Sequence, residues 1–363
     1  MNKVIILGAG ATFGAASTNG SLQPPLLPDL YKILDADFIS LNQSVDGPIL
    51  RDTFRILLEI THTKEDIERF FTLLQVIEDI RLGYNPNDLR LDPLKMKELY
   101  NDSVFFDPLI WSYNLSETDV KDIKMILGYL VENPKRQILC CPNNFCRLFT
   151  YALNEYLYRS ILDDFCIYHD KLFADLETKD TVATYNYDEI ADFTLFLRGK
   201  LSDQSFDGLG FSRITLPKEP IASESVNLLK LHGSFNWHTI DLENIHYILG
   251  SQNAVLPKVI LPFYHKDKIY QTNKIYRMHM KKFGQKIHEA EEIILVGKNF
   301  RNSDSELNRF ITGCTQGPTK TIRIIDPKIN DNTFIDYHIK LFNAEFVGGW
   351  ESLKKFYHSS NST

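Results

Sequence analysis

Glycines near the N-terminus form a loop whose residue types could hold a phosphate group. Gly8, Gly10 and Gly14 follow the apolar run Val4 to Leu7, which is short, rich in β-branched side chains and typical of a buried strand. Glycine allows a sharp turn and a close approach to a ligand, and free amides at a helix start favour a pyrophosphate. The segment is therefore a candidate nucleotide-binding loop, and an ordinary tight strand–helix turn is the alternative.

The loop differs from the dinucleotide fingerprint of dehydrogenases in two respects. That fingerprint expects its third glycine where this chain has Phe13, and Gly14 comes one residue later. It also has an acidic residue about 20 positions further on, at the end of a second strand. Residues 28–38 have the apolar spacing of a helix instead. A redox dehydrogenase is accordingly the least favoured class of nucleotide-binding protein.

Three further groups of residues come directly after runs that are typical of strands. Asn186 and Asp188 follow one run, His232 follows another, and Gly297 with Asn299 follows a third. Ligands bind at the carboxyl ends of parallel strands, so we expect these groups to converge on the glycine loop. Each signal has a structural alternative, because such a histidine is often a hydrogen-bonded core residue and Asn-x-Asp often begins a helix.

Short apolar runs separated by longer helical or irregular stretches predict an α/β fold with a doubly wound, mostly parallel, Rossmann-like sheet. The expected strands are 3–7, 181–185, 228–231, 257–261, 292–296 and 321–325. A long, mainly helical stretch separates the first two of them. We therefore expect a nucleotide-binding core of residues 1–40 and 176–363, with a large helical insertion of residues 41–175.

Two capping boxes predict helix starts within the insertion. Residues 63–66 read Thr-Lys-Glu-Asp, and residues 116–119 read Ser-Glu-Thr-Asp. The first box precedes one apolar helix face, formed by Ile67, Phe70, Phe71, Leu74 and Ile77. The second precedes the face formed by Val120, Ile123, Leu127 and Leu130. A third helix is expected over residues 145–162.

Composition excludes several classes of protein. The chain has 363 residues, is 44% hydrophobic and carries a formal net charge of −7 without a long basic run, so neither nucleic acid nor a membrane is an expected partner. The first strand begins at once, which leaves no signal-peptide pattern and predicts a cytoplasmic protein. None of the five cysteines forms a C-x-x-C pair, so we expect buried thiols and no zinc or other metal.

Taken in order, four motifs resemble the sirtuin family. They are GAGA near the N-terminus, TYNYD, KLHGS, and the late strand of AEEIILVGKNF followed by Asp304. More narrowly, they are similar to the sirtuin-like (Sir2-like) NAD+-hydrolysing domains of bacterial antiphage defence systems, in the short form found in HerA-associated effectors. The resemblance covers residues 3 to about 327. It differs from deacylating sirtuins, which carry a four-cysteine zinc ribbon and Gln-Asn-Ile-Asp where this chain has Tyr-Asn-Tyr-Asp.

The resemblance implies a sirtuin-type fold in which NAD+ is a substrate whose nicotinamide–ribose bond is broken. It assigns catalytic roles to Asn186, which would hold the ribose or the attacking water, and to His232, which would act as acid or base. Asp188 would shape the nicotinamide pocket, and Asp326 would accept the adenine-ribose hydroxyls. The residues that it implies for NAD+ binding are Gly8, Ala9, Gly10, Ala11, Thr12, Asp188, Gly233, Gly297, Asn299 and Asp326.

The expected function is therefore that of an NAD+ glycohydrolase (NADase), which depletes NAD+ as an abortive-infection effector against phage. The resemblance further implies control by homo-oligomerisation or by a partner, such as a HerA-type ATPase or a nucleotide-responsive subunit. Two alternatives stay open. One is a non-catalytic sensor of NAD+ or ADP-ribose, and the other is a protein deacylase or ADP-ribosyltransferase.

Overall fold

The structure of the chain is a computed structural model, and its two compact units can each be described. The residues that it describes are 2–15, 47–63, 66–84, 113, 115–133, 136, 149–150, 152–153, 155–156, 166–217, 225–239, 244–250, 257–260, 267–300, 305–317 and 319–359. The first unit comprises residues 1–26, 157–260 and 266–363, and the second comprises 27–156 and 261–265. Helix α10 (Ile167–Phe173), which the sequence-based division placed in the insertion, belongs to the first unit.

A six-stranded parallel sheet forms the centre of the first unit. Its strands are β1 (Lys3–Leu7), β2 (Thr181–Thr184), β4 (Asn227–Lys230), β8 (Glu292–Val296), β9 (Lys320–Ile325) and β10 (Ala344–Trp350). They lie in the order β10-β9-β8-β1-β2-β4, and every neighbouring pair is parallel. Numbered along the chain, this is the 3-2-1-4-5-6 order of dinucleotide-binding sheets. The structure thus confirms the predicted α/β class and its Rossmann-like parallel sheet.

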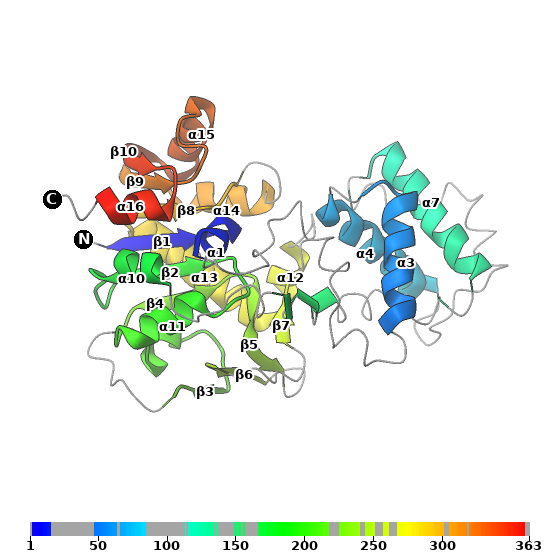
Figure 1. Cartoon of the computed structure of the whole chain (residues 1–363), viewed down its shortest axis with the longest axis horizontal. Coiled ribbons are helices and arrows are strands. Elements are labelled where there is room, and N and C mark those ends of the chain that lie inside the picture. Colours follow the sequence, from blue (N-terminus) through cyan, green and yellow to red (C-terminus); the bar gives the residue numbers. More distant parts are fainter. Residues whose placement is uncertain are drawn as a thin grey trace. The chain divides into compact units, whose positions relative to one another are not determined.

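Helices accompany the strands of the first unit, as Figure 1 shows. They are α1 (Ala9–Ala15), α10, α11 (Ile190–Leu197), α12 (Asp267–Thr272), α13 (Lys274–Glu289), α14 (Ser305–Cys314), α15 (Asn332–Phe342) and α16 (Leu353–Ser359), with a short 3-10 helix, η2 (Asp203–Phe206). The apolar run of β1 is almost completely buried from Val4 to Leu7. Burial on both faces explains why this strand is continuously apolar.

A second, smaller sheet contains one segment that the sequence had suggested for the main sheet. Its strands β3 (Arg213–Thr215), β6 (Ile245–Ile248), β5 (Gly233–Thr239) and β7 (Pro257–Val259) lie in the order β3-β6-β5-β7. β7 lies within the predicted strand 257–261 but pairs antiparallel with β5, so its expected place in a parallel sheet is wrong. A short apolar run does not specify its partner, and the chain turns back after β4 to form β5.

The sequence did not predict strand β10. Its sequence AEFVGGW contains two glycines, and its Phe346 and Val347 are 36% and 46% exposed. The strand lies at the edge of the sheet, and its register with β9 shifts between Phe346 and Gly348. An edge strand with an irregularity does not need the continuous apolar run that marks β1 and β8.

The second unit contains α3 (Gly47–Ile60), α4 (Ile67–Tyr84) and α7 (Glu117–Glu132). The predicted capping box of α7 is confirmed, because the Ser116 side chain accepts from the Asp119 amide and Asp119 accepts from the Ser116 amide. At α4, the capping oxygen belongs to Asp66, which accepts from the amide of Arg69. The expected helix over 28–38 lies outside the described residues, and so does most of the one over 145–162. No described helix has both the length and the apolar character needed to cross a bilayer.

Arg69 joins two helices of this unit, and its loss should weaken the unit in a pH-dependent way. Its Nε lies 2.7 Å from Asp119 Oδ1, and its Nη2 contacts Asp122. Burial raises the pKa of Asp119, but hydrogen bonds from Ser116 and Arg69 outweigh it, and the pKa is lowered from its ordinary value of 3.8. A lowered pKa stabilises the folded state above the ordinary value, and this contribution disappears as the pH falls through the folded-state pKa.

We therefore expect Arg69→Met to lower the free energy of unfolding by about 1.5–3 kcal/mol at neutral pH. The loss should shrink at a pH well below 3.8, where Asp119 becomes protonated. Denaturant unfolding at both pH values measures it. Lys121→Met, on the exposed side of α7, is the control and should change stability by no more than about 0.5 kcal/mol. An equal loss at both pH values would contradict the role of Asp119.

Candidate functional site

The predicted site residues surround the point at which the strand order reverses. β1 has β2 on one side and β8 on the other, and the chain builds the β2 side before it returns to add β8. Open α/β sheets bind ligands at such a switch point, beyond the carboxyl ends of the strands. The segment from Gly8 to Thr12 follows β1, and the segment from Gly297 to Asn299 follows β8. Both predicted loops therefore lie at this edge, next to each other.

The backbones of these two loops touch at glycines. The Gly8 amide donates to the Val296 carbonyl at 2.9 Å, and the Gly10 amide donates to the Gly297 carbonyl at 3.1 Å. A Cβ added at Gly8 would lie 2.5 Å from the Gly297 oxygen, and one at Gly10 would lie 2.9 Å from the Gly297 Cα. Gly297 itself has a φ of +56°. The glycines are therefore required by backbone packing, whatever ligand the loop binds.

Some amides that were expected to face a phosphate are already used within the loop. Gly10 donates to Gly297, and Ala11 donates to the Gly8 carbonyl at 2.9 Å. Ala9 is the exposed residue of the segment, whereas the side chains of Ala11 and Thr12 are buried. A phosphate at this loop would consequently need donors other than the amides of Gly10 and Ala11.

Asn186 links the loop after β2 to the glycine loop. Its Nδ2 donates to the Gly8 carbonyl at 2.9 Å and to Thr12 Oγ1 at 2.7 Å, while its own amide donates to Thr184 Oγ1. Because a carbonyl can only accept, the side-chain atom that faces Gly8 must be the nitrogen. Both hydrogens of this amide group are thus engaged, and the remaining polar atom of the side chain is an acceptor, Oδ1.

Asp188 lies on the same loop and extends this chain of hydrogen bonds. Thr12 Oγ1 donates to Asp188 Oδ2 at 2.6 Å, and the Ile190 amide donates to Oδ1 at 3.1 Å. Burial raises the pKa of this carboxyl, against the opposing effects of the Lys230 charge and the Thr12 hydrogen bond. Asp188 therefore helps to hold the glycine loop in place through Thr12, and it is also the acidic residue that follows the second strand of the sheet.

His232 is placed at this edge by the turn between β4 and β5. It is only 8% exposed, and its ring meets the Tyr185 ring edge-on, with centroids 4.9 Å apart. The Tyr187 ring lies 6.3 Å from it, so two rings of the loop after β2 flank the imidazole. Its carbonyl accepts from the Ile260 amide at 2.7 Å, and Gly233, with φ of +77°, turns the chain into β5.

The loop after β8 reaches the same aromatic group. The Lys298 ammonium lies 4.3 Å from the centre of the Tyr185 ring and 5.1 Å from that of Phe300. Tyr185 therefore contacts residues from the loops after both β4 and β8. Asn299, the predicted residue next to Lys298, is half-buried in this loop.

Asp326 lies two strands from β1, on the opposite side of β1 from His232. It follows β9, which is separated from β1 by β8. Its Oδ1 accepts from the Lys328 amide at 2.9 Å, and burial raises its pKa. The described hydrogen bonds join the glycine loop to Asn186 and Asp188, and none of them joins it to Asp326.

A buried ion pair that was not predicted from the sequence adjoins the loop of Asp188. Lys230 Nζ lies 2.7 Å from Asp192 Oδ2, and both side chains are completely buried. One signal was present, because Lys230 stands between leucines in a strand expected to be buried on both faces. Its partner could not be recognised, since Asp192 is 38 residues away on α11.

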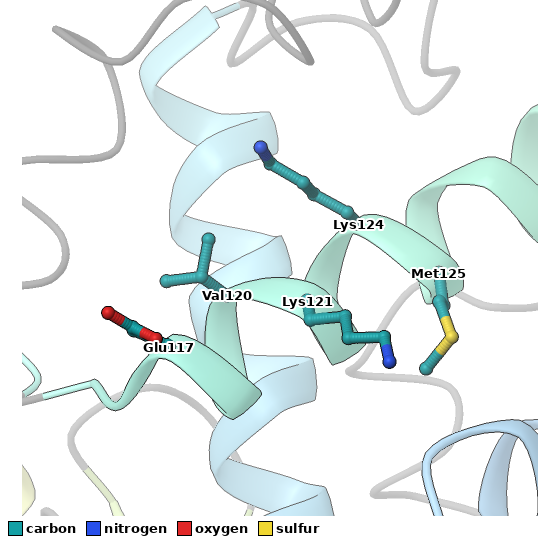
Figure 2. Close-up of a pocket in the computed structure, with 5 residues that line it drawn as sticks. All are labelled: Glu117, Val120, Lys121, Lys124 and Met125. Atoms are coloured by element: carbon teal, nitrogen blue, oxygen red, sulfur yellow. The ribbon is translucent and has the colours of Figure 1, made fainter.

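A separate pocket lies on the surface of the second unit. Its volume is about 410 Å³, and the described residues that line it are Glu117, Val120, Lys121, Lys124 and Met125, all from α7 (Figure 2). None of these is a predicted site residue. Metal sites are also missing from the described part of the chain, where no three His, Cys, Asp or Glu side chains come together as ligands.

The sheet order and the converging loops define a Rossmann-like α/β protein with a candidate ligand site at its switch point. No protein-family model matches the chain, and a search of curated proteins also gives no match.

Proposed function

We propose that the chain is a sirtuin-like NAD+ glycohydrolase that cleaves NAD+ to nicotinamide and ADP-ribose. One observation carries the proposal. A sheet with the strand order of dinucleotide-binding proteins has, at its switch point, a glycine loop hydrogen-bonded through Thr12 to both Asn186 and Asp188. Lys298 adds a positive charge at the same edge, which suits the pyrophosphate of a dinucleotide.

The proposed reaction requires little acid catalysis. When the nicotinamide–ribose bond breaks, its electron pair returns to the ring, and nicotinamide leaves as a neutral molecule. The ribose then resembles an oxocarbenium ion, as in the cleavage of other glycosides. Water attacks this carbon, and its proton must be accepted by a base. Asn186 Oδ1 would orient the water, and His232 would accept the proton.

Control by a partner or by self-assembly belongs to this proposal, because unregulated hydrolysis of NAD+ would harm the host cell. We therefore propose an effector of antiphage defence whose activity depends on a second subunit or on oligomerisation. The sensor alternative predicts binding of NAD+ without turnover. The deacylase alternative would need an acyl-lysine site, and no described residue supports one.

A dehydrogenase is the second candidate, and one observation favours it. Asp188 follows the second strand of the sheet, where dinucleotide-binding folds place the acid that binds a ribose. Against this, both oxygens of Asp188 already accept hydrogen bonds from within the protein. The two activities differ in their products, because reduction of NAD+ creates near-ultraviolet absorbance and hydrolysis does not.

The decisive experiment incubates the purified chain with NAD+, alone and with the protein encoded beside it. Chromatography measures nicotinamide and ADP-ribose, and absorbance detects NADH. We expect equal amounts of nicotinamide and ADP-ribose without NADH. Binding of NAD+ without either product under every condition would favour the sensor, and NADH formation with a reduced substrate would favour the dehydrogenase.

A further inference from the structure

Lys230 is a completely buried lysine at the carboxyl end of β4. Its Nζ donates to Asp192 Oδ2 at 2.7 Å and to the Asp188 carbonyl at 2.5 Å. Burying a charged group is costly even when it is paired, and an apolar side chain of similar size would often be as stable. The position of this lysine therefore calls for an explanation beyond stability.

The partner carboxylate is fully satisfied and connects three elements. Asp192, on α11, also accepts from Asn236 Nδ2 at 3.0 Å and from the Tyr247 hydroxyl at 2.6 Å. Asn236 belongs to β5 and Tyr247 to β6, so the second sheet holds one side of Asp192 while β4 supplies the lysine. A buried hydrogen-bond network of this kind favours one arrangement of its members.

The lysine contacts two points on residues 188–192, which run from the loop after β2 into the first turn of α11. It bonds to the carbonyl of Asp188 at one end and to the carboxylate of Asp192 at the other. The Asp188 side chain, meanwhile, accepts from Thr12 in the glycine loop. A movement of residues 188–192 would therefore disturb the hydrogen bond between Thr12 and Asp188.

We infer that Lys230 is a positioning residue, which clamps residues 188–192 so that Asp188 and Asn186 hold the glycine loop in one conformation. It does not itself contact a ligand. The clamp is a property of the structure, and only its effect on turnover rests on the proposed function.

The charged and titratable groups around the clamp predict how its loss acts on Asp188. Burial raises the pKa of this carboxyl, Lys230 lowers it, and Asp192 raises it by a smaller effect. Three other titratable groups interact here. The pKa of Cys166 is raised by burial and, to a smaller extent, by Asp188. Burial and Lys230 lower the pKa of His279, and burial and Asp192 raise that of Tyr247. Without Lys230, the pKa of Asp188 should rise further.

Hydrogen–deuterium exchange tests the clamp without reference to activity. We expect Lys230→Met to speed exchange of the Ile190 and Phe193 amides by about tenfold or more, because a hydrogen bond to a charged donor is lost. Lys200→Met is the matched control, since Lys200 also donates to a backbone carbonyl, that of Leu176, and it should leave those amides unchanged. Unchanged exchange in Lys230→Met would overturn the inference.

A double variant separates positioning from simple charge neutralisation. Lys230→Met with Asp192→Asn removes both charges and protects against misfolding caused by an unpaired carboxylate. In this variant, exchange of the Ile190 and Phe193 amides should remain as fast as in Lys230→Met. The pH at which nicotinamide release is half-maximal should be higher than in the wild type in both variants, because the pKa of Asp188 rises when Lys230 is lost. Recovery of wild-type exchange would show that Lys230 only neutralises Asp192, which refutes positioning. If no variant or wild type releases nicotinamide, the proposed function fails while the exchange result still decides the clamp.

Discussion

His232→Ala should slow nicotinamide release by about 10²–10⁴-fold, the usual contribution of a general base. His232 is held between the rings of Tyr185 and Tyr187 at the carboxyl edge of the sheet, and its carbonyl is fixed by Ile260. The variant loses the imidazole but keeps this backbone bond, so we expect NAD+ to bind almost as before. Steady-state release at saturating NAD+, together with calorimetric binding, measures both effects.

Asn186→Ala should reduce the same rate by about 10²-fold or more, because small displacements of a positioning group are costly. It removes two hydrogen bonds that hold the glycine loop as well as the oxygen that would orient water. Its control is Asn227→Ala, which removes a similar bond to the Asp180 carbonyl at the opposite edge of the sheet. The control for His232→Ala is His288→Ala, which removes an exposed imidazole that contacts the Cys314 carbonyl. Retained release in both site variants would refute the assignment of this site.

A methyl group at Gly297 should be among the most destabilising single changes in the first unit. Its Cβ would lie 2.5 Å from the carbonyl carbon of Gly10 and 2.6 Å from the Ala11 nitrogen, and both are backbone atoms that cannot rotate away. The φ of +56° adds a further penalty for any residue with a Cβ. We expect Gly297→Ala to lower the free energy of unfolding by about 2–4 kcal/mol.

The control for this prediction is Gly313→Ala in α14. Nothing lies within 4 Å of a Cβ at Gly313, and its position in a helix favours alanine. Its stability should therefore be unchanged or rise by up to about 1 kcal/mol. Denaturant unfolding of both variants gives the comparison, and equal midpoints would show that the glycine contact is not tight.

Much of the central sheet could be predicted because buried parallel strands are continuously apolar. β1 and β8 have the bounds that their apolar runs predict, and the α7 capping box was recognisable from local sequence alone. Strand β10 was not predicted, because it is an edge strand with glycines and exposed side chains. Strand β7 was predicted from its apolar run, but its antiparallel pairing with β5 was not. Pairing depends on the path of the rest of the chain, which a local apolar run does not specify.

The candidate site was predictable as a set of loops but not as a set of contacts. Position after a strand was enough to bring Asn186, Asp188 and the glycine loop together. It could not reveal that these side chains bind one another, or that Gly297 contacts Gly8 through the backbone. The same limit applies to Lys230 and Asp192, whose pairing depends on the packing of α11 against β4.

The central position of β1 has a consequence for how the first unit folds. Val4 pairs with Thr181 and Lys3 pairs with Glu292, so both neighbours of the N-terminal strand lie far along the chain. Closing such long loops is slow, and contacts of this range raise the kinetic barrier to folding. During synthesis, the apolar strand β1 stays unpaired until β2 and β8 have been made. Until then it is exposed or covered by other parts of the chain. Strand β1 can be paired on both sides only when nearly 300 residues have been made, and a chain that stops before β8 lacks one side of its central strand.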